Sequence, residues 1–147
     1  MPRVNASATA RTDPGTAWAV LQEPNRWAPL APHVRAVDRP SAGRTAWDVL
    51  LNGSRCRWVQ RESAQRPGLT RFEKVHGDVV KLHGNWSVRE TPAGIVIALD
   101  LEFDLGVDGL APLLNPIWTQ SFQAHADALV RAVAAACTSA HAVKERT

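Results

Sequence analysis

The sequence predicts an α+β fold in which a curved antiparallel sheet of about seven strands wraps on one long C-terminal helix. Segments that alternate apolar and polar residues follow one another along the middle of the chain, and short turns rich in Gly, Pro, Asn and Asp separate them. After Asn115 the apolar spacing becomes helical. With 147 residues, 45% of them hydrophobic, the chain fits one domain, residues 1–147, with room for a sizeable core.

The N-terminal part predicts one strand and two short helices. "RVNASATA" has the alternation of a first strand. Asp13 followed by Pro14 is typical of a helix start, with Asp13 as the N-cap. The three prolines of "PNRWAPLAPH" predict a short second helix or an irregular turn after it.

Six further strand signals follow in hairpin order. They are "HVRAVDR", "RTAWDVLL", "SRCRWVQRE", "LTRFEKVH", "VVKLHGNWSVRE" and "GIVIALDLEFDL". Because short loops join nearly all of them, we expect a meandering antiparallel sheet with one face in water.

The last segment predicts a long amphipathic helix that begins after Asn115, a possible N-cap, and Pro116. Its apolar stripe also carries His125, and consists of Trp118, Phe122, Leu129, Val133 and Ala136. We expect the core to span about residues 4–137 and the tail beyond it to fray. A twisted sheet of this length curls, so sheet and helix should enclose a pocket.

From about Val4 to Val133 the chain resembles the START/SRPBCC helix-grip (Bet v1-like) superfamily. Within it, the chain is similar to single-domain polyketide aromatase/cyclases. The similarity rests on the closing helix and on "DPGTAWAVLQEPNRWAPL", "RWVQRE", "KVHGDVVKLHGNWSV" and "LEFDL". It implies a cavity that binds a poly-β-ketone tethered to an acyl carrier protein and promotes aldol ring closure and dehydration without a cofactor. Lipid and quinone carriers of the same superfamily imply the alternative, a non-catalytic binder of a hydrophobic small molecule.

The resemblance also shows where this chain departs from the family pattern. Inward positions that hold a small hydroxyl and then an arginine in the family correspond here to Gln60 and Glu62. The family's pocket tyrosine has no counterpart, because the chain contains no tyrosine. A basic inward position corresponds to Lys74, and an amide position on the long helix corresponds to His125.

The residues themselves suggest four catalytic candidates: Glu62, Lys74, His125 and Gln60. Read as a strand, residues 54–64 place Gln60 and Glu62 on the row opposite three arginines, and therefore towards the interior. An unpaired buried carboxylate is costly, so we expect Lys74 to pair with Glu62. Glu62 or a neutral His125 could take a proton from the carbon between two ketones, while Gln60 or Lys74 holds the enolate oxygen.

The predicted substrate-binding residues are mostly apolar and lie inward by parity or on the helix stripe. They are Trp58, Trp86, Phe72, His76, Leu99, Leu101, Phe103, Trp118 and Phe122. Six tryptophans suit the lining of a cavity for an unsaturated ligand. Two plainer interpretations stay open: a strand-end carboxylate such as Glu62 can lie half wet at the rim, and any single tryptophan can be core filler.

Other classes of function find little support in the sequence. His76 and His83 fall on opposite faces, and no metal-binding spacing, dinucleotide fingerprint or phosphate loop occurs, so we expect neither metal nor cofactor. The 17 basic residues form no run typical of nucleic-acid binding, although Arg55, Arg57 and Arg61 suit an acidic carrier protein. A chain without a signal-like or membrane-spanning segment is expected in the cytoplasm, with Cys56 and Cys137 reduced. A homodimer is left open.

Overall fold

The computed structural model describes residues 2–106 and 111–146, with the side chains of the last helix described over residues 114–143. In chain order the elements are β1 Arg3–Ala10, α1 Pro14–Leu21, α2 Pro24–Trp27, η1 Ala28–Leu30, β2 Val34–Ser41, β3 Arg44–Leu51, β4 Ser54–Arg66, β5 Leu69–Gly77, β6 Lys81–Thr91, β7 Gly94–Asp104 and α3 Ala111–Arg146.

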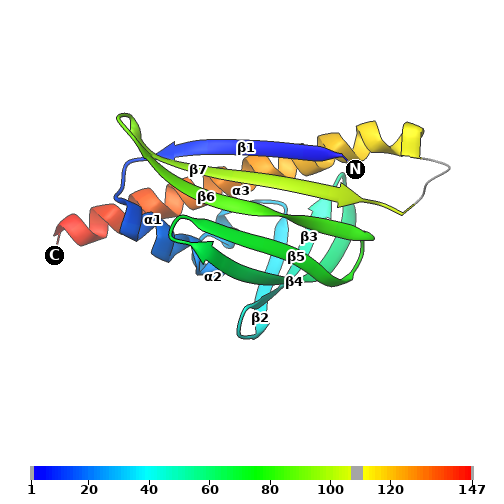
Figure 1. Cartoon of the computed structure of the whole chain (residues 1–147), viewed down its shortest axis with the longest axis horizontal. Helices are drawn as coiled ribbons and strands as arrows, with labels where there is room; N and C mark the ends of the chain where they lie inside the picture. The colour runs from blue at the N-terminus through cyan, green and yellow to red at the C-terminus, as the bar shows by residue number, and fades with distance from the viewer. Residues whose placement is uncertain (1, 107–110, 147) are drawn as a thin grey trace.

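The strands form one seven-stranded antiparallel sheet in the order β1-β7-β6-β5-β4-β3-β2. Strands β2 to β7 therefore pair with their sequence neighbours, and β1 completes the sheet by pairing with β7. The sheet curls over α3, which runs along its concave side (Figure 1). The predicted meander and the helix that it wraps are confirmed.

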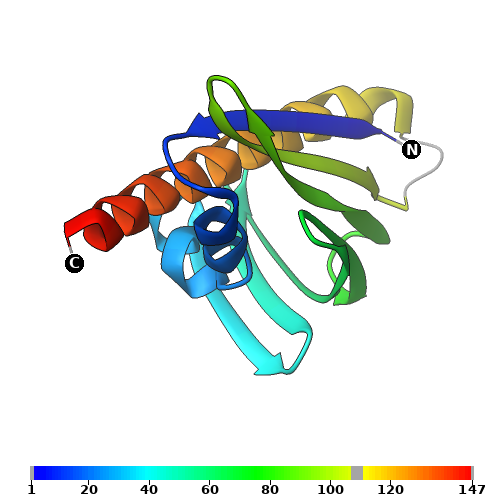
Figure 2. The same cartoon turned by 60° about the vertical axis from the view of Figure 1, so that its left-hand side comes forward.

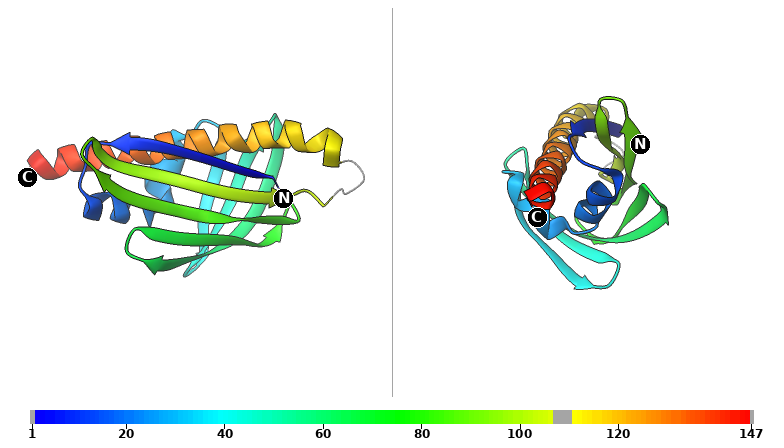
Figure 3. Two further views of the ribbon diagram at one scale, coloured as in Figure 1. Left: turned by 45° about the horizontal axis from the view of Figure 1, so that its top comes forward. Right: turned by 90° about the vertical axis from the view of Figure 1, so that its left-hand side faces the viewer.

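The two short helices lie beside the C-terminal half of α3 (Figure 2). As predicted, Asp13 caps α1, because its carboxylate accepts a hydrogen bond from Thr16 N at 2.8 Å, and Pro14 occupies the first turn. The proline-rich segment forms α2 and η1. Viewed along α3, the sheet wraps one side of the helix while α1 and α2 stand at the near end (Figure 3).

Helix α3 is longer at both ends than the sequence predicts. It begins at Ala111, so the predicted start after Asn115 is wrong, and Pro116 lies inside the helix. A proline there removes one backbone hydrogen bond without ending this helix. Towards the C-terminus the helix continues to Arg146, through the segment that was expected to fray. Within that segment, His141 Nδ1 lies 3.5 Å from Asp13 Oδ2. None of the described helices is long and apolar enough to cross a membrane.

The core lies between the concave face of the sheet and α3. Strand β7 shows why: its residues alternate strictly between buried and half-buried, so that Leu99, Leu101 and Phe103 all point towards the helix. From the helix, Phe122, Val130 and Val133 are buried against them. The apolar parity predicted for this strand is therefore confirmed.

Candidate functional site

Two histidines from distant parts of the chain meet beside the core. His125 lies on α3 and is only 5% exposed, while His33 precedes β2 and is half-buried. His33 Nε2 lies 2.6 Å from His125 Nδ1, and the rings are nearly perpendicular. At that separation one nitrogen donates a hydrogen and the other accepts it. The two imidazoles therefore form one hydrogen-bonded pair.

Burial keeps this pair neutral at pH 7. Removal from water and, secondarily, the charge of His33 lower the pKa of His125 to about 3. Burial also lowers the pKa of His33. A neutral imidazole has one donor and one acceptor nitrogen, so the pair has two arrangements that differ in which ring donates. His125 Nε2 has no hydrogen-bond partner among the described residues, which leaves it open to a ligand.

The interior space beside His125 is small. Its volume is about 20 Å³, room for about one water molecule, whereas pockets for small molecules usually enclose about 300–1,000 Å³. Indole rings fill the rest of the interior. The ring centroids of the stacked Trp47 and Trp58 are 6.2 Å apart, and those of Trp27 and Trp86 are 5.3 Å apart. The prediction of a ligand-sized hollow enclosed by sheet and helix is therefore wrong for this structure.

A larger groove lies on the other side of the histidine pair. It has a volume of about 430 Å³ and runs between α3, the end of β3 and the segment before β2. Its lining consists of Pro32, His33, Leu50, Leu51, Asn52, Gln120, Ser121, Ala124, His125, Ala128 and Arg131. Since His125 lines both this groove and the interior space, its ring stands between them.

Most of the predicted site residues do come together around the interior space. Those that line it are Gln60, Trp58, Phe72, Trp86, Leu99, Leu101 and His125. Gln60 faces inward as predicted, is 5% exposed, and accepts a hydrogen bond on Oε1 from Trp58 Nε1 at 2.9 Å. The Gln60 amide nitrogen keeps its hydrogens for another acceptor.

The expected pairing of Glu62 with Lys74 is wrong. The strand register places Lys74 opposite Gln60, and Glu62 opposite Phe72. Lys74 Nζ instead donates to the carbonyls of Val79 and Val80, in the segment that leads to β6. Glu62 accepts a hydrogen bond from the Thr45 hydroxyl on β3. Neither residue lines the interior space or the groove.

His76 points away from the interior, contrary to the parity argument. Val59 pairs with His76 whereas the next residue, Gln60, pairs with Lys74, so β5 carries one extra residue, Val75. This β-bulge reverses the alternation of the strand beyond it. His76 therefore shares the outward row with Val59 and is exposed.

Phe103, Phe122 and Trp118 form a separate aromatic cluster. The rings of Phe103 and Phe122 stack with their centroids 4.3 Å apart, and the centroids of Trp118 and Phe122 are 6.3 Å apart. None of the three lines the interior space or the groove. Phe122 nevertheless contacts His125 edge to face at 6.2 Å, so this cluster supports the histidine from one side.

Sequence reasoning missed His33 and Trp47. Trp47 stands on β3 directly opposite Trp58, and its inward parity within "RTAWDVLL" could have identified it. His33 lies 92 positions before its partner, after three prolines that make the path of the chain unpredictable. No signal in the sequence connects it to His125.

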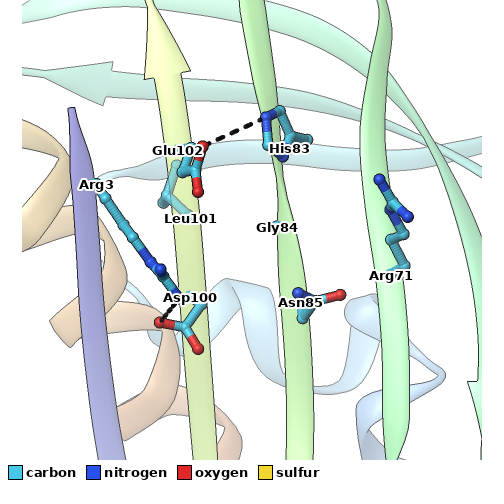
Figure 4. A pocket seen from close by; sticks show the side chains of 8 residues that line it. All are labelled: Arg3, Arg71, His83, Gly84, Asn85, Asp100, Leu101 and Glu102. Atoms are coloured by element: carbon cyan, nitrogen blue, oxygen red, sulfur yellow. Dashed lines mark hydrogen bonds and ion pairs between the residues drawn. The ribbon is translucent and has the colours of Figure 1, made fainter. Parts of the chain in front are cut away.

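The outer face of the sheet has a hollow of about 260 Å³ that carries charges (Figure 4). Arg3 Nη2 lies 3.4 Å from Asp100 Oδ1, and His83 Nε2 lies 3.7 Å from Glu102 Oε2. Exposed ion pairs of this kind contribute little to stability. Because the charges largely satisfy one another, we do not place the functional site here.

Within the described residues, no group of three or more His, Cys, Asp and Glu side chains is arranged to hold a metal ion. The side chains that surround His125 supply imidazole, amide and indole groups.

The sequence of this chain matches a known protein family. The family model described as polyketide cyclase/dehydrase and lipid transport matches residues 1–134. The chain belongs to this family. A comparison with curated proteins gives no significant match.

Several solved structures share the START helix-grip fold of this chain. TTHA0849 from Thermus thermophilus has a TM-score of 0.86 at 19% identity, over 95% of this chain and 99% of that one. A START superfamily protein from Mycobacterium smegmatis has a TM-score of 0.70 at 16% identity, over 89% and 96%. The Zhui aromatase/cyclase from Streptomyces sp. R1128 has a TM-score of 0.60 at 17% identity, over 98% and 93%. At these identities the shared property is the fold.

Proposed function

We propose that this protein is a polyketide cyclase/aromatase-like enzyme that binds a poly-β-ketone or a related intermediate and promotes its cyclisation and dehydration. The observation that carries the proposal is the neutral His33–His125 pair, placed where the groove meets the interior. Membership of the polyketide cyclase/dehydrase and lipid transport family supports it.

The substrate would lie in the groove rather than in the interior. The groove, at about 430 Å³, has the size of a typical ligand pocket, while the interior holds little more than a water molecule. Leu51, Ala124 and Ala128 give the groove an apolar wall, and the histidine pair supplies a polar group within it. A chain of alternating ketones and apolar carbons fits such a surface.

The proposed chemistry is proton transfer through the pair. When His125 Nδ1–H donates to His33 Nε2, His125 Nε2 carries a lone pair and can accept the acidic proton between two ketones. The Nδ1 proton then passes to His33, so the positive charge settles on the wetter ring and an enolate forms. After the enolate attacks another ketone, the reverse transfer protonates the new alkoxide, and loss of water from the aldol product follows.

The structure offers groups that could assist this transfer. The Gln60 amide can donate to an oxygen or to a water molecule on the interior side of His125. Arg131, the permanent cation that lines the groove, offers positive charge to an acidic carrier protein that delivers the chain. Of the arginines suggested for that role by the sequence, Arg55 is bound to Asp48 and Arg61 contacts Glu73.

A second candidate function, non-catalytic binding of a hydrophobic small molecule, is favoured by the burial of His125, which is only 5% exposed. The low pKa of His125, about 3, makes it a weak base. If the proton transfer through His33 does not compensate for that weakness, the groove would hold a lipid- or quinone-like molecule without changing it.

A product assay separates the two functions. A reactive poly-β-ketone, generated on its acyl carrier protein, is incubated with the protein, and the ring products are compared with those formed spontaneously. We expect the wild type to redirect the products, and His125→Phe and His33→Phe to lose about 10²-fold or more of that activity, the usual contribution of a general acid–base group.

The matched control is His76→Phe, which changes an exposed histidine on the outer face. It should retain the wild-type products. Spontaneous products in the presence of the wild type, together with saturable binding of a hydrophobic probe, would favour the binder. Unchanged products in both pair variants would remove the pair from any catalytic role.

A further inference from the structure

Glu62 lines a second pocket, which is polar. Its volume is about 200 Å³, and it opens between the β2–β3 hairpin, the end of β4, the start of β5 and the segment after α1. It is lined by Gln22, Arg39, Gly43, Arg44, Thr45, Glu62, Ser63, Ala64 and Thr70. It shares no lining residue with the groove or with the interior space.

Buried hydroxyl groups form the floor of this polar pocket. Thr45 and Thr70 are only 2% and 4% exposed. Gln22 Nε2 donates to Thr70 Oγ1 at 3.2 Å, and Arg39 Nη2 donates to the Gln22 carbonyl at 2.6 Å. Both hydroxyls already have partners in the protein, because Thr70 accepts from Gln22 and Thr45 bonds to Trp47 and Glu62, so the floor of the pocket is polar and fixed in position.

The walls of the polar pocket carry charges of both signs. Arg44 has no ion-pair partner among the described residues, so its guanidinium is available to an anion. Glu62 uses one carboxylate oxygen to accept from the Thr45 hydroxyl, which leaves the second oxygen to accept from a ligand. A molecule that satisfies both needs an anionic group and hydrogen-bond donors a few atoms away.

We propose that this polar pocket is a second ligand site, for a small carboxylate that carries hydroxyl groups. Arg44 and Arg39 hold the carboxylate, and Glu62 accepts from the hydroxyls above Thr45 and Thr70. The proposal is independent of the function assigned to the groove, since the two sites have separate linings.

Two successive hydrogen bonds connect Glu62 in the polar pocket to Trp47 in the core. Trp47 Nε1 donates to Thr45 Oγ1 at 2.9 Å, and Thr45 in turn donates to Glu62. A ligand that takes hold of Glu62 changes the environment of the Trp47 indole. The ring centroids of Trp47 and His125 are 6.5 Å apart, so Trp47 lies between the polar pocket and the histidine pair.

The test is a titration followed by the six indole N–H signals in a ¹⁵N-labelled sample, with the Trp47 signal assigned from Trp47→Phe. The probe is D-gluconate, and the neutral polyol D-sorbitol is its matched control. We expect gluconate to move the Trp47 signal in a saturable way with a Kd below about 10 mM, and sorbitol to bind about tenfold more weakly or not at all.

Two variants locate the binding. Arg44→Gln and Glu62→Gln should each raise the Kd for gluconate about tenfold, whereas Arg89→Gln, on an exposed part of β6, should leave it unchanged. The proposal is overturned if gluconate gives no saturable shift, if sorbitol matches it, or if both pocket variants bind like the wild type. A failed product assay for the groove would leave these outcomes unaffected.

Discussion

Trp47 and Trp58 stand directly opposite each other on β3 and β4, and their rings stack with an angle of only 7°. Their centroids lie 6.5 and 6.0 Å from that of His125, which meets each ring edge to face. This stack closes the interior of the fold and gives the buried histidine an apolar contact surface. Ligand access to the inner side of His125 therefore depends on it.

Trp58→Ala should open the interior. Removing a buried tryptophan costs about 3–5 kcal/mol, and here it also leaves Gln60 without its indole donor. We expect a loss of that size in the free energy of unfolding from urea titration, together with new binding of an apolar fluorescent probe. Trp118→Ala, at a half-buried position away from the interior, should cost less and bind no additional probe.

Stability should fall in mild acid because of His125. The unfolded state binds a proton on this ring near its ordinary pKa of about 6.5, and the folded state only near pH 3. The unfolded state therefore gains protons as the pH falls from 6.5 to 3, and stability decreases over that window. From about pH 8 to about pH 5 the loss assigned to His125 is about 2 kcal/mol.

The measurement is urea unfolding of the wild type and of His125→Gln at both pH values. The variant should lose about 2 kcal/mol less than the wild type on acidification. His76→Gln, at an exposed position, should follow the wild type. Equal losses in all three proteins would contradict the assigned burial of His125.

Gly84→Ala should destabilise the sheet. A Cβ at Gly84 would come within 2.8 Å of the Phe72 ring and still closer to the Asp100 carbonyl, so β6 and β7 would have to separate. Overpacking of this kind costs about 1–3 kcal/mol, visible as a lower denaturant midpoint. Gly15→Ala is the control: its Cβ meets only an ordinary contact inside α1, where alanine should stabilise the helix.

Thr45 should matter through its hydroxyl rather than its shape. Thr45→Val keeps the branched side chain but leaves the Trp47 N–H without its acceptor, at a cost of about 1–3 kcal/mol. Thr45→Ser retains the hydroxyl and should cost less. If thermal or urea unfolding shows the valine variant as stable as the serine variant, the hydrogen bond does not contribute as described.

Much of this fold follows from local patterns. Asp13 and Pro14 specify the start of α1 through capping chemistry, and strict alternation along β7 specifies which of its residues face the helix. Tight turns between strands specify the order of the sheet. Each of these signals acts over a few residues, so it can be read from the sequence alone.

The candidate site depends on information that local patterns lack. Val75 forms a bulge that turns His76 outward, and alternation cannot show where a strand gains a residue. The same register places Lys74 opposite Gln60 instead of Glu62. Whether six tryptophans line a hollow or fill it depends on packing in three dimensions, and the contact between His33 and His125 depends on the path of the whole chain.

The most direct test of the account is a ¹⁵N NMR titration of the imidazole nitrogens of His125 and His33. We predict that His125 stays neutral from about pH 8 to about pH 5. We also predict a scalar coupling between His33 Nε2 and His125 Nδ1 across their hydrogen bond. Loss of that coupling in His33→Phe would complete the assignment. A His125 that titrates near its ordinary pKa of about 6.5, with no coupling to His33, would contradict the pair on which the proposed chemistry rests.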